Sequence, residues 1–178
     1  MTAQLPAAFK TAVRQWAWIL ACLPVWALAG PPSAGMSALP GEALQVARDL
    51  AADARVVRQR RILLMVLYSR ADCPWCERAR RQYLLPLAAE PASAGRVMMR
   101  QIDLDSDAAL VDFNGKTTTH ALFGKSQHAK LTPTLMFYGP DGRQVAEAIV
   151  GFLLADFYAA HIERGIDQGL AALRQGNP

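Results

Sequence analysis

Cysteine is scarce in this sequence, which has only three in 178 residues. Cys22 lies in an apolar stretch near the N-terminus, whereas Cys73 and Cys76 are three residues apart. Two cysteines this close together cannot make a disulfide framework for a domain of this size. They therefore predict either a redox-active pair or one half of a metal site.

The excess of positive charge is also small. The chain has 19 Lys and Arg against 15 Asp and Glu. Residues 1–40 contain only Lys10 and Arg14, so without them 17 basic and 15 acidic residues remain. A net charge of about +2 is too low to indicate a nucleic-acid-binding protein. We expect no nucleic-acid partner, and we interpret the arginines within 58–61 and 78–81 as solvated faces.

The first 41 residues contain no acidic side chain. Lys10 and Arg14 precede an apolar segment over residues 16–29, which ends in Ala-Leu-Ala, the pattern of a signal-peptidase site. The apolar run has about 15 residues, whereas a membrane-spanning helix needs about 20. We therefore predict a signal peptide over residues 1–29, cleaved near Ala29, and a periplasmic or secreted protein. An uncleaved membrane anchor and a lipoprotein signal at Cys22 are the less favoured alternatives.

The length suits one domain with an extra segment. Residues 30–40 are rich in Gly, Pro and Ser, which is the composition of a linker, and we expect them to be disordered or removed. No internal repeat is visible. A single domain is therefore predicted over residues 41–178.

Helix and strand patterns alternate along this predicted domain. Residues 41–58 have helical spacing of apolar side chains, and the apolar run 62–68 has the length of a central strand covered on both faces. Residues 77–89 are helical in composition, with Pro86 as an expected kink. Further expectations are strands at 97–104, 134–138 and 144–150, a hairpin around Asn114-Gly115, a turn at 140–142, and helices at 118–126 and 152–174. The order predicts an α/β fold with a mixed sheet of about four strands between helices.

The run Cys73-Pro74-Trp75-Cys76 stands where the central strand leads into the next helix. Cys73 would be the N-cap and Pro74 the first helical residue, where proline is preferred. The free N–H groups and the positive dipole end of a helix N-terminus favour a thiolate. We expect Cys73 to be the exposed nucleophile and Cys76, one turn later, to be the more buried resolving thiol.

Metal binding stays open as an alternative for this pair. Zinc would need two further ligands, and His120 and His128 are the obvious candidates. Their spacing fits no helical pair, and each alone is more typical of a plain surface histidine. Thr132-Pro133, before the strand at 134–138, also has two readings: an ordinary edge feature, or a cis peptide bond.

Together these residues resemble the thioredoxin superfamily over about residues 42–174. The matching features are the strand 62–68, Cys73-Pro74-Trp75-Cys76, Thr132-Pro133 before 134–137, and the glycines Gly142 and Gly151. The resemblance implies a thioredoxin-like fold with an extra N-terminal helix. It also implies a cis Pro133 packed against the cysteine pair, and a Thr132 backbone that pairs with a bound substrate chain. Residues 112–115 and 132–143 further resemble the secreted SoxW-type branch, whose members often accompany sulfur-oxidation proteins.

The sequence departs from ordinary thioredoxins at several positions. Pro74-Trp75 replaces the usual Gly-Pro, and Leu67 stands where the family has a buried Asp that takes the proton of the second cysteine. Asp72 and Glu77 are close in sequence, but we interpret both as solvated carboxylates rather than a proton relay. Trp75 has two readings: packing against the neighbouring loops, or an apolar contact for a protein substrate.

The resemblance and the export signal together imply an exported thiol–disulfide oxidoreductase with no cofactor. We expect it to reduce protein disulfides through Cys73 and Cys76, because no histidine separates the cysteines as in strong oxidants. An exported reductase cannot draw on cytosolic reductant, so a membrane electron donor is an expected partner. An oxidase or isomerase of the same fold, and a dithiol module that binds metal or acts as a chaperone, are the alternatives.

Overall fold

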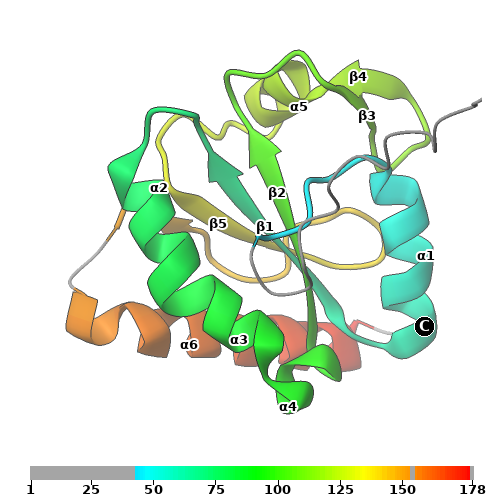
Figure 1. Cartoon of the computed structure of the whole chain (residues 1–178). Coiled ribbons are helices and arrows are strands. Elements are labelled where there is room, and N and C mark those ends of the chain that lie inside the picture. The colour runs from blue at the N-terminus through cyan, green and yellow to red at the C-terminus, as the bar shows by residue number, and fades with distance from the viewer. Residues whose placement is uncertain (1–42, 153–154, 177–178) are drawn as a thin grey trace, which may run out of the picture. The chain divides into compact units, whose positions relative to one another are not determined.

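A four-stranded sheet forms the centre of the part of the chain that the computed structural model describes, residues 43–152 and 155–176. In spatial order its strands are β2 (Val97–Asp103), β1 (Leu63–Ser69), β5 (Thr134–Tyr138) and β6 (Ile149–Val150). β1 runs parallel to β2 and antiparallel to β5, and β5 runs antiparallel to β6. The expected α/β fold with a mixed sheet of four strands is confirmed (Figure 1).

The central strand β1 is buried along its whole length, as its continuous apolar sequence predicts. Its successive side chains point to opposite faces of the sheet, so each face has its own apolar core. The helical elements around them are α1 (Leu50–Arg60), α2 (Pro74–Ala79), η1 (Arg80–Leu84), α5 (His120–Ser126) and α6 (Ala155–Gln175). Leu63, Met65 and Leu67 pack with apolar residues of α2, η1 and α6. Leu64 and Val66 pack with residues of α1 and α5 on the other face.

The helix predicted over residues 41–58 is shorter than expected, because α1 begins at Leu50. Asp49 is its N-cap and accepts a hydrogen bond from the Ala52 N–H at 2.7 Å. The residues before it are extended along the edge of β2. The Ala47 N–H donates to the Gln101 carbonyl, and the Gln101 N–H donates to the Gln45 carbonyl. These edge hydrogen bonds satisfy backbone groups that a longer helix would have used internally.

The helical stretch that carries the cysteine pair runs from Pro74, its predicted first residue, through α3 (Leu85–Ala89). The irregularity expected at Pro86 is a π-helical turn, η1, in which the Leu85 N–H donates to the Arg80 carbonyl. Proline has no N–H for the α-helical bond to the fourth residue before it, so a widened turn here costs less than elsewhere in the helix. The short helix α4 (Pro91–Ala94) follows before β2.

The hairpin expected around Asn114-Gly115 is present as β3 (Ala109–Val111) and β4 (Thr117–Thr119), with Gly115 at a φ of 79°. The strand expected over residues 144–150 is only partly formed. It contains an isolated bridge from Gln144 to Tyr138, and regular pairing is confined to β6.

Residues 1–42 include the predicted signal peptide and linker, and these predictions lie outside the described residues. Among the helices that are described, none is both long enough and apolar enough to cross a membrane.

Candidate redox site

The two cysteines are joined in a disulfide where β1 leads into α2. Cys73 is the N-cap of the helix and Pro74 occupies its first turn, as the sequence predicts. The Cys76 N–H donates a hydrogen bond of 3.1 Å to Cys73 Sγ, and the two Cα atoms are 5.2 Å apart. The free end of the helix therefore directs a backbone donor at the first sulfur.

The two sulfurs differ in their access to solvent. Cys76 is 1% exposed, whereas Cys73 is partly exposed. Of the two sulfurs, Cys73 is therefore the one that a partner molecule can reach without unfolding the helix.

The Thr132–Pro133 peptide bond is cis, which decides between the two readings that the sequence leaves open. Thr134, the next residue, pairs with Tyr68 at the end of β1, just before the turn that leads to the disulfide. The Gly151 N–H donates to the Pro133 carbonyl at 2.8 Å. Pro133 is buried and Thr132 is partly exposed, so this register brings the cis-proline loop to the same end of the sheet as the cysteines.

Trp75 is packed on one side, as the first of its two readings predicts, and exposed on the other. Its ring is stacked on Phe152, with a centroid separation of 5.5 Å and an interplanar angle of 21°, yet the residue is 54% exposed. The Arg78 guanidinium lies 5.9 Å from the Trp75 ring and 5.4 Å from the Phe152 ring. Trp75 is therefore held in place on one side and presents the rest of its surface to solvent beside the disulfide.

Phe152 also packs against two tyrosine rings, so the stack belongs to a larger aromatic cluster. Phe152 lies 4.8 Å from Tyr158 and 5.9 Å from Tyr83, measured between ring centroids. The Tyr158 hydroxyl is buried and has no hydrogen-bond partner among the described residues, and its burial raises the pKa of Tyr158, with a smaller contribution from Tyr83. Sequence reasoning missed Phe152 as a site residue, because nothing in its spacing connects it with Trp75.

Leu67 occupies the position where the resemblance implies a buried acid. It is 1% exposed and belongs to the same apolar core as Ala79, in the helix that carries the cysteines. The one carboxylate buried in the described part of the chain is Asp53, which is ion-paired with Arg100 on the other side of the sheet.

The two carboxylates close to the cysteines in sequence are not buried. Asp72 is exposed. Glu77 is partly buried and ion-paired with Arg80 and Arg81, and Arg80 also donates to the Gln101 side chain at 3.0 Å. Glu77 therefore links the helix to β2 through Arg80 instead of standing free as a proton acceptor.

The histidines considered as metal ligands are not brought together. The interpretation of His120 as a surface residue is wrong: it is 1% exposed, its Nδ1 accepts from the Asp103 N–H at 3.0 Å, and its Nε2 therefore donates to the Ala47 carbonyl. Both ring nitrogens are occupied by backbone groups. His128 is exposed, with a φ of 56°. In residues 43–152 and 155–176, no three His, Cys, Asp or Glu side chains form a group that could hold a metal ion.

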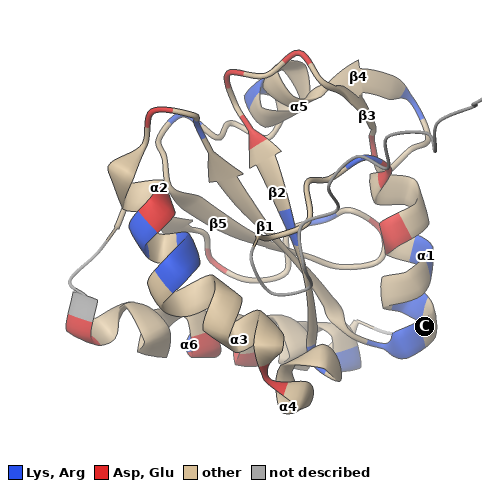
Figure 2. Cartoon of the chain, viewed as in Figure 1, with Lys and Arg blue, Asp and Glu red and all other residues tan. Residues whose placement is uncertain are grey.

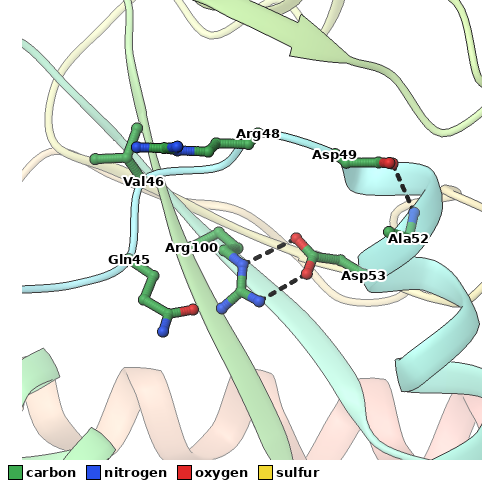
Figure 3. Close-up of a pocket in the computed structure, with 7 residues that line it drawn as sticks. All are labelled: Gln45, Val46, Arg48, Asp49, Ala52, Asp53 and Arg100. Atoms are coloured by element: carbon green, nitrogen blue, oxygen red, sulfur yellow. Dashed lines mark hydrogen bonds and ion pairs between the residues drawn. The ribbon is translucent and has the colours of Figure 1, made fainter. Parts of the chain in front are cut away.

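A hollow of about 450 Å³ lies elsewhere, between the extended segment 45–49, α1 and β2 (Figure 3). Within it, Asp53 accepts two hydrogen bonds from the Arg100 guanidinium, at 2.6 and 2.9 Å. None of its lining residues belongs to the disulfide helix or to the cis-proline loop. The paired charges in this hollow hold α1 against the sheet, so we do not assign it to the redox site.

Comparisons with known proteins identify the domain type. A family model described as a thioredoxin-like domain matches residues 50–166, which is more than half of the chain. No curated protein matches the chain. Solved structures with a similar fold include mitochondrial thioredoxin 3 of Saccharomyces cerevisiae in its oxidized form, which is 17% identical, with 70% of this chain and 93% of that chain covered and a TM-score of 0.48. Thioredoxin from Fasciola hepatica is 16% identical, with 71% and 99% covered and a TM-score of 0.49.

Proposed function

Because the chain belongs to the thioredoxin-like family, we propose that it is an exported thiol–disulfide oxidoreductase that reduces protein disulfides. The observation that carries the proposal is the asymmetric pair: a partly exposed Cys73 at a helix N-cap, bonded to a Cys76 that is 1% exposed. A thioredoxin-like fold with such a pair fits thiol–disulfide redox chemistry in general. Export and the direction of electron flow are the further parts of the proposal.

The reaction starts from the reduced pair. The Cys73 thiolate attacks one sulfur of the partner's disulfide, forming a mixed disulfide while the partner's other sulfur leaves as a thiolate. The Cys76 N–H, which points at Cys73 Sγ, and the helix N-terminus favour the thiolate needed for this attack.

The second step closes the Cys73–Cys76 disulfide. Cys76, as a thiolate, attacks Cys73 Sγ, and the partner's remaining sulfur leaves as a thiolate. The partner has then gained two electrons and this protein has lost two. The Cα separation of 5.2 Å lies in the normal range for a disulfide, so the bond can form without movement of the helix.

Three residues around the pair are proposed to hold the substrate. Trp75 offers an exposed apolar ring, and the partly exposed Thr132 precedes the buried cis Pro133. An extended substrate segment would lie between them, with the Thr132 backbone as its hydrogen-bonding partner. An exported enzyme would also need an electron donor at the membrane to reduce the pair again.

An oxidase or isomerase of the same fold is the second candidate, and the reduction potential of the pair separates the two. A value near about −270 mV is that of a thioredoxin-like reductant, and one near about −120 mV is that of a strong oxidant. A dithiol metal-binding module is a weaker candidate, because both nitrogens of His120 are bound to backbone groups and the described residues offer no third ligand.

Insulin reduction with dithiothreitol tests the proposed activity. The full-length protein should accelerate the reaction above the dithiothreitol background, and Cys73→Ser should abolish the acceleration, because no nucleophile remains at the exposed position. Cys22→Ser is the matched control, since Cys22 lies outside the pair, and it should keep full activity. Acceleration that survives in Cys73→Ser would refute the proposal.

Trapping with the reduced protein, freed of dithiothreitol before insulin is added, provides a second readout. Cys76→Ala keeps the nucleophile but removes the resolving thiol, so it should accumulate a mixed disulfide with insulin that dithiothreitol releases. The same adduct should be absent from a protein that also carries Cys73→Ser.

A further inference from the structure

Basic residues lie in the helical stretch that carries the disulfide (Figure 2). Arg78 lies in α2, and Arg80 and Arg81 follow in η1. Glu77 is ion-paired with Arg80 and Arg81 but not with Arg78. The single charge of Glu77 is shared by two of the three arginines, so this stretch stays positive, and Arg78 is the arginine of the three that has no ion pair with Glu77.

Arg78 is exposed, and in the described part of the chain no carboxylate pairs with it. Its Nε donates to the Gln82 side chain at 3.1 Å, and its guanidinium lies within 6 Å of the Trp75 and Phe152 ring centroids. Aromatic faces attract and orient a guanidinium while leaving its outer N–H groups free. Arg78 is thus an oriented cation on the ring that lies beside the disulfide, and an exposed carboxylate ligand is the group it lacks.

We propose that Arg78 recognises an acidic side chain near the cysteine of the substrate, so that the preferred substrates are protein disulfides flanked by Asp or Glu. The inference rests on the proposed thiol–disulfide exchange and names its substrate class. The bound segment places its cysteine at Cys73 and an apolar surface against Trp75, and its carboxylate lies against the free N–H groups of Arg78.

The other charges around the site restrict where this preference acts. Asp72, exposed and next to Cys73, disfavours an acidic group on its own side, and Asp105 is engaged by the Ala71 N–H at 3.0 Å. Arg70 and Lys130 are exposed and have no carboxylate partner among the described residues. The charge preference therefore acts on the side of the site where Trp75 and Arg78 lie.

The test uses three short peptides, each a dimer through a single disulfide, which differ only in a Glu, Gln or Lys two residues after the cysteine. The full-length protein is reduced, freed of reductant and mixed with each dimer in a stopped-flow instrument. Formation of the Cys73–Cys76 disulfide reduces one peptide disulfide to two thiols, so no electron donor is needed. The rate constant for each peptide is divided by its rate constant with 2-mercaptoethanol, which removes differences in intrinsic reactivity.

The wild type should favour the Glu peptide over the Gln peptide by about two- to fivefold at low salt, the range expected for one exposed ion pair. The Lys peptide should be the slowest. In Arg78→Met, whose side chain still covers the rings, the Glu-to-Gln ratio should fall to about one. Arg78→Lys should keep part of the preference, and salt near 0.5 M should weaken it in the wild type.

Arg174→Met is the matched control, because Arg174 is an exposed arginine in the last turn of α6, the end of that helix away from Phe152. It should keep the wild-type ratio. A ratio that is unchanged in Arg78→Met, or equally reduced in Arg174→Met, would overturn the inference while leaving the proposed function intact. Failure of the wild type to exchange with all three peptides would overturn both.

Discussion

Gly165 of α6 touches the ring of Phe137 in β5, and this contact sets how closely the helix lies on the sheet. A Cβ added at Gly165 would lie 2.4, 2.5 and 3.0 Å from three carbons of that ring. Carbon atoms prefer separations of about 3.5–4.0 Å, so the helix or the ring would have to move. Phe137 is 0% exposed and sits in the core that also supports the disulfide helix. Gly165→Ala therefore tests how rigid this core is.

Two effects of opposite sign decide the outcome of this substitution. Alanine is favoured over glycine inside a helix by about 0.8–1.0 kcal/mol. Overpacking a buried site costs about 1–3 kcal/mol, and three close contacts with a fully buried ring place this case towards the upper end. We therefore expect the free energy of unfolding to fall by about 1–2 kcal/mol, and the midpoint of thermal unfolding to fall by about 2–8 °C.

Urea unfolding followed by circular dichroism measures this change, with Gly95→Ala as its control. A Cβ at Gly95 would meet only the Ala92 carbonyl, at 3.7 Å, so its effect should stay within about 0.5 kcal/mol. The decisive comparison repeats Gly165→Ala in a Phe137→Leu background. With the ring removed, the added methyl should cost less than in the wild type or even stabilise the helix. An equal loss in both backgrounds would refute the steric argument.

Two other predictions concern alkaline stability and processing. Burial raises the pKa of Tyr138 to about 12, and its hydrogen bond with Tyr68 opposes that rise. An unfolded tyrosine ionises near pH 10, so Tyr138 should lower the free energy of unfolding between about pH 10 and 12, by up to about 1.4 kcal/mol per pH unit, and not below pH 10. Urea unfolding of Tyr138→Phe should show a shallower slope in that window, and an identical slope would contradict the assignment. Intact-mass measurement of the protein from an exporting bacterium should show loss of residues 1–29, whereas a full-length mass in the membrane fraction would support an anchor instead.

The fold could be predicted from the sequence where the signal is local. The apolar run of β1 and the alternation of strands and helices determine the layers, and both are patterns over a few residues. Local turn chemistry also places the β3–β4 hairpin at Asn114-Gly115. The predicted start of α1 is wrong. The observed start depends on hydrogen bonds between residues 45–47 and Gln101, which are more than fifty positions apart. Helical spacing alone cannot reveal such a competitor.

In the candidate site, too, the residues with a local sequence signal could be predicted and those placed by long-range contacts could not. Cys73, Pro74 and Cys76 could be placed at a helix start from their own sequence, whereas the stack of Trp75 on Phe152 joins two residues that are far apart in the sequence. His120 was misjudged for a similar reason. Its partners are the backbones of two separate segments, at Asp103 and Ala47, and a lone histidine carries no mark of them.

Leu67, in place of the acid that the resemblance implies, affects the two proposed steps differently. The helix end stabilises the first thiolate directly, because the Cys76 N–H points at Cys73 Sγ. Cys76 has no comparable help: Leu67 is part of an apolar core, and Glu77 is committed to arginines. In the proposed reaction, the proton of Cys76 therefore passes to water or to the leaving thiolate of the partner when Cys76 attacks the mixed disulfide. We therefore expect the helix end to promote the proposed attack by Cys73, and the rate of the proposed attack by Cys76 to depend on whether the bound partner leaves water in the site.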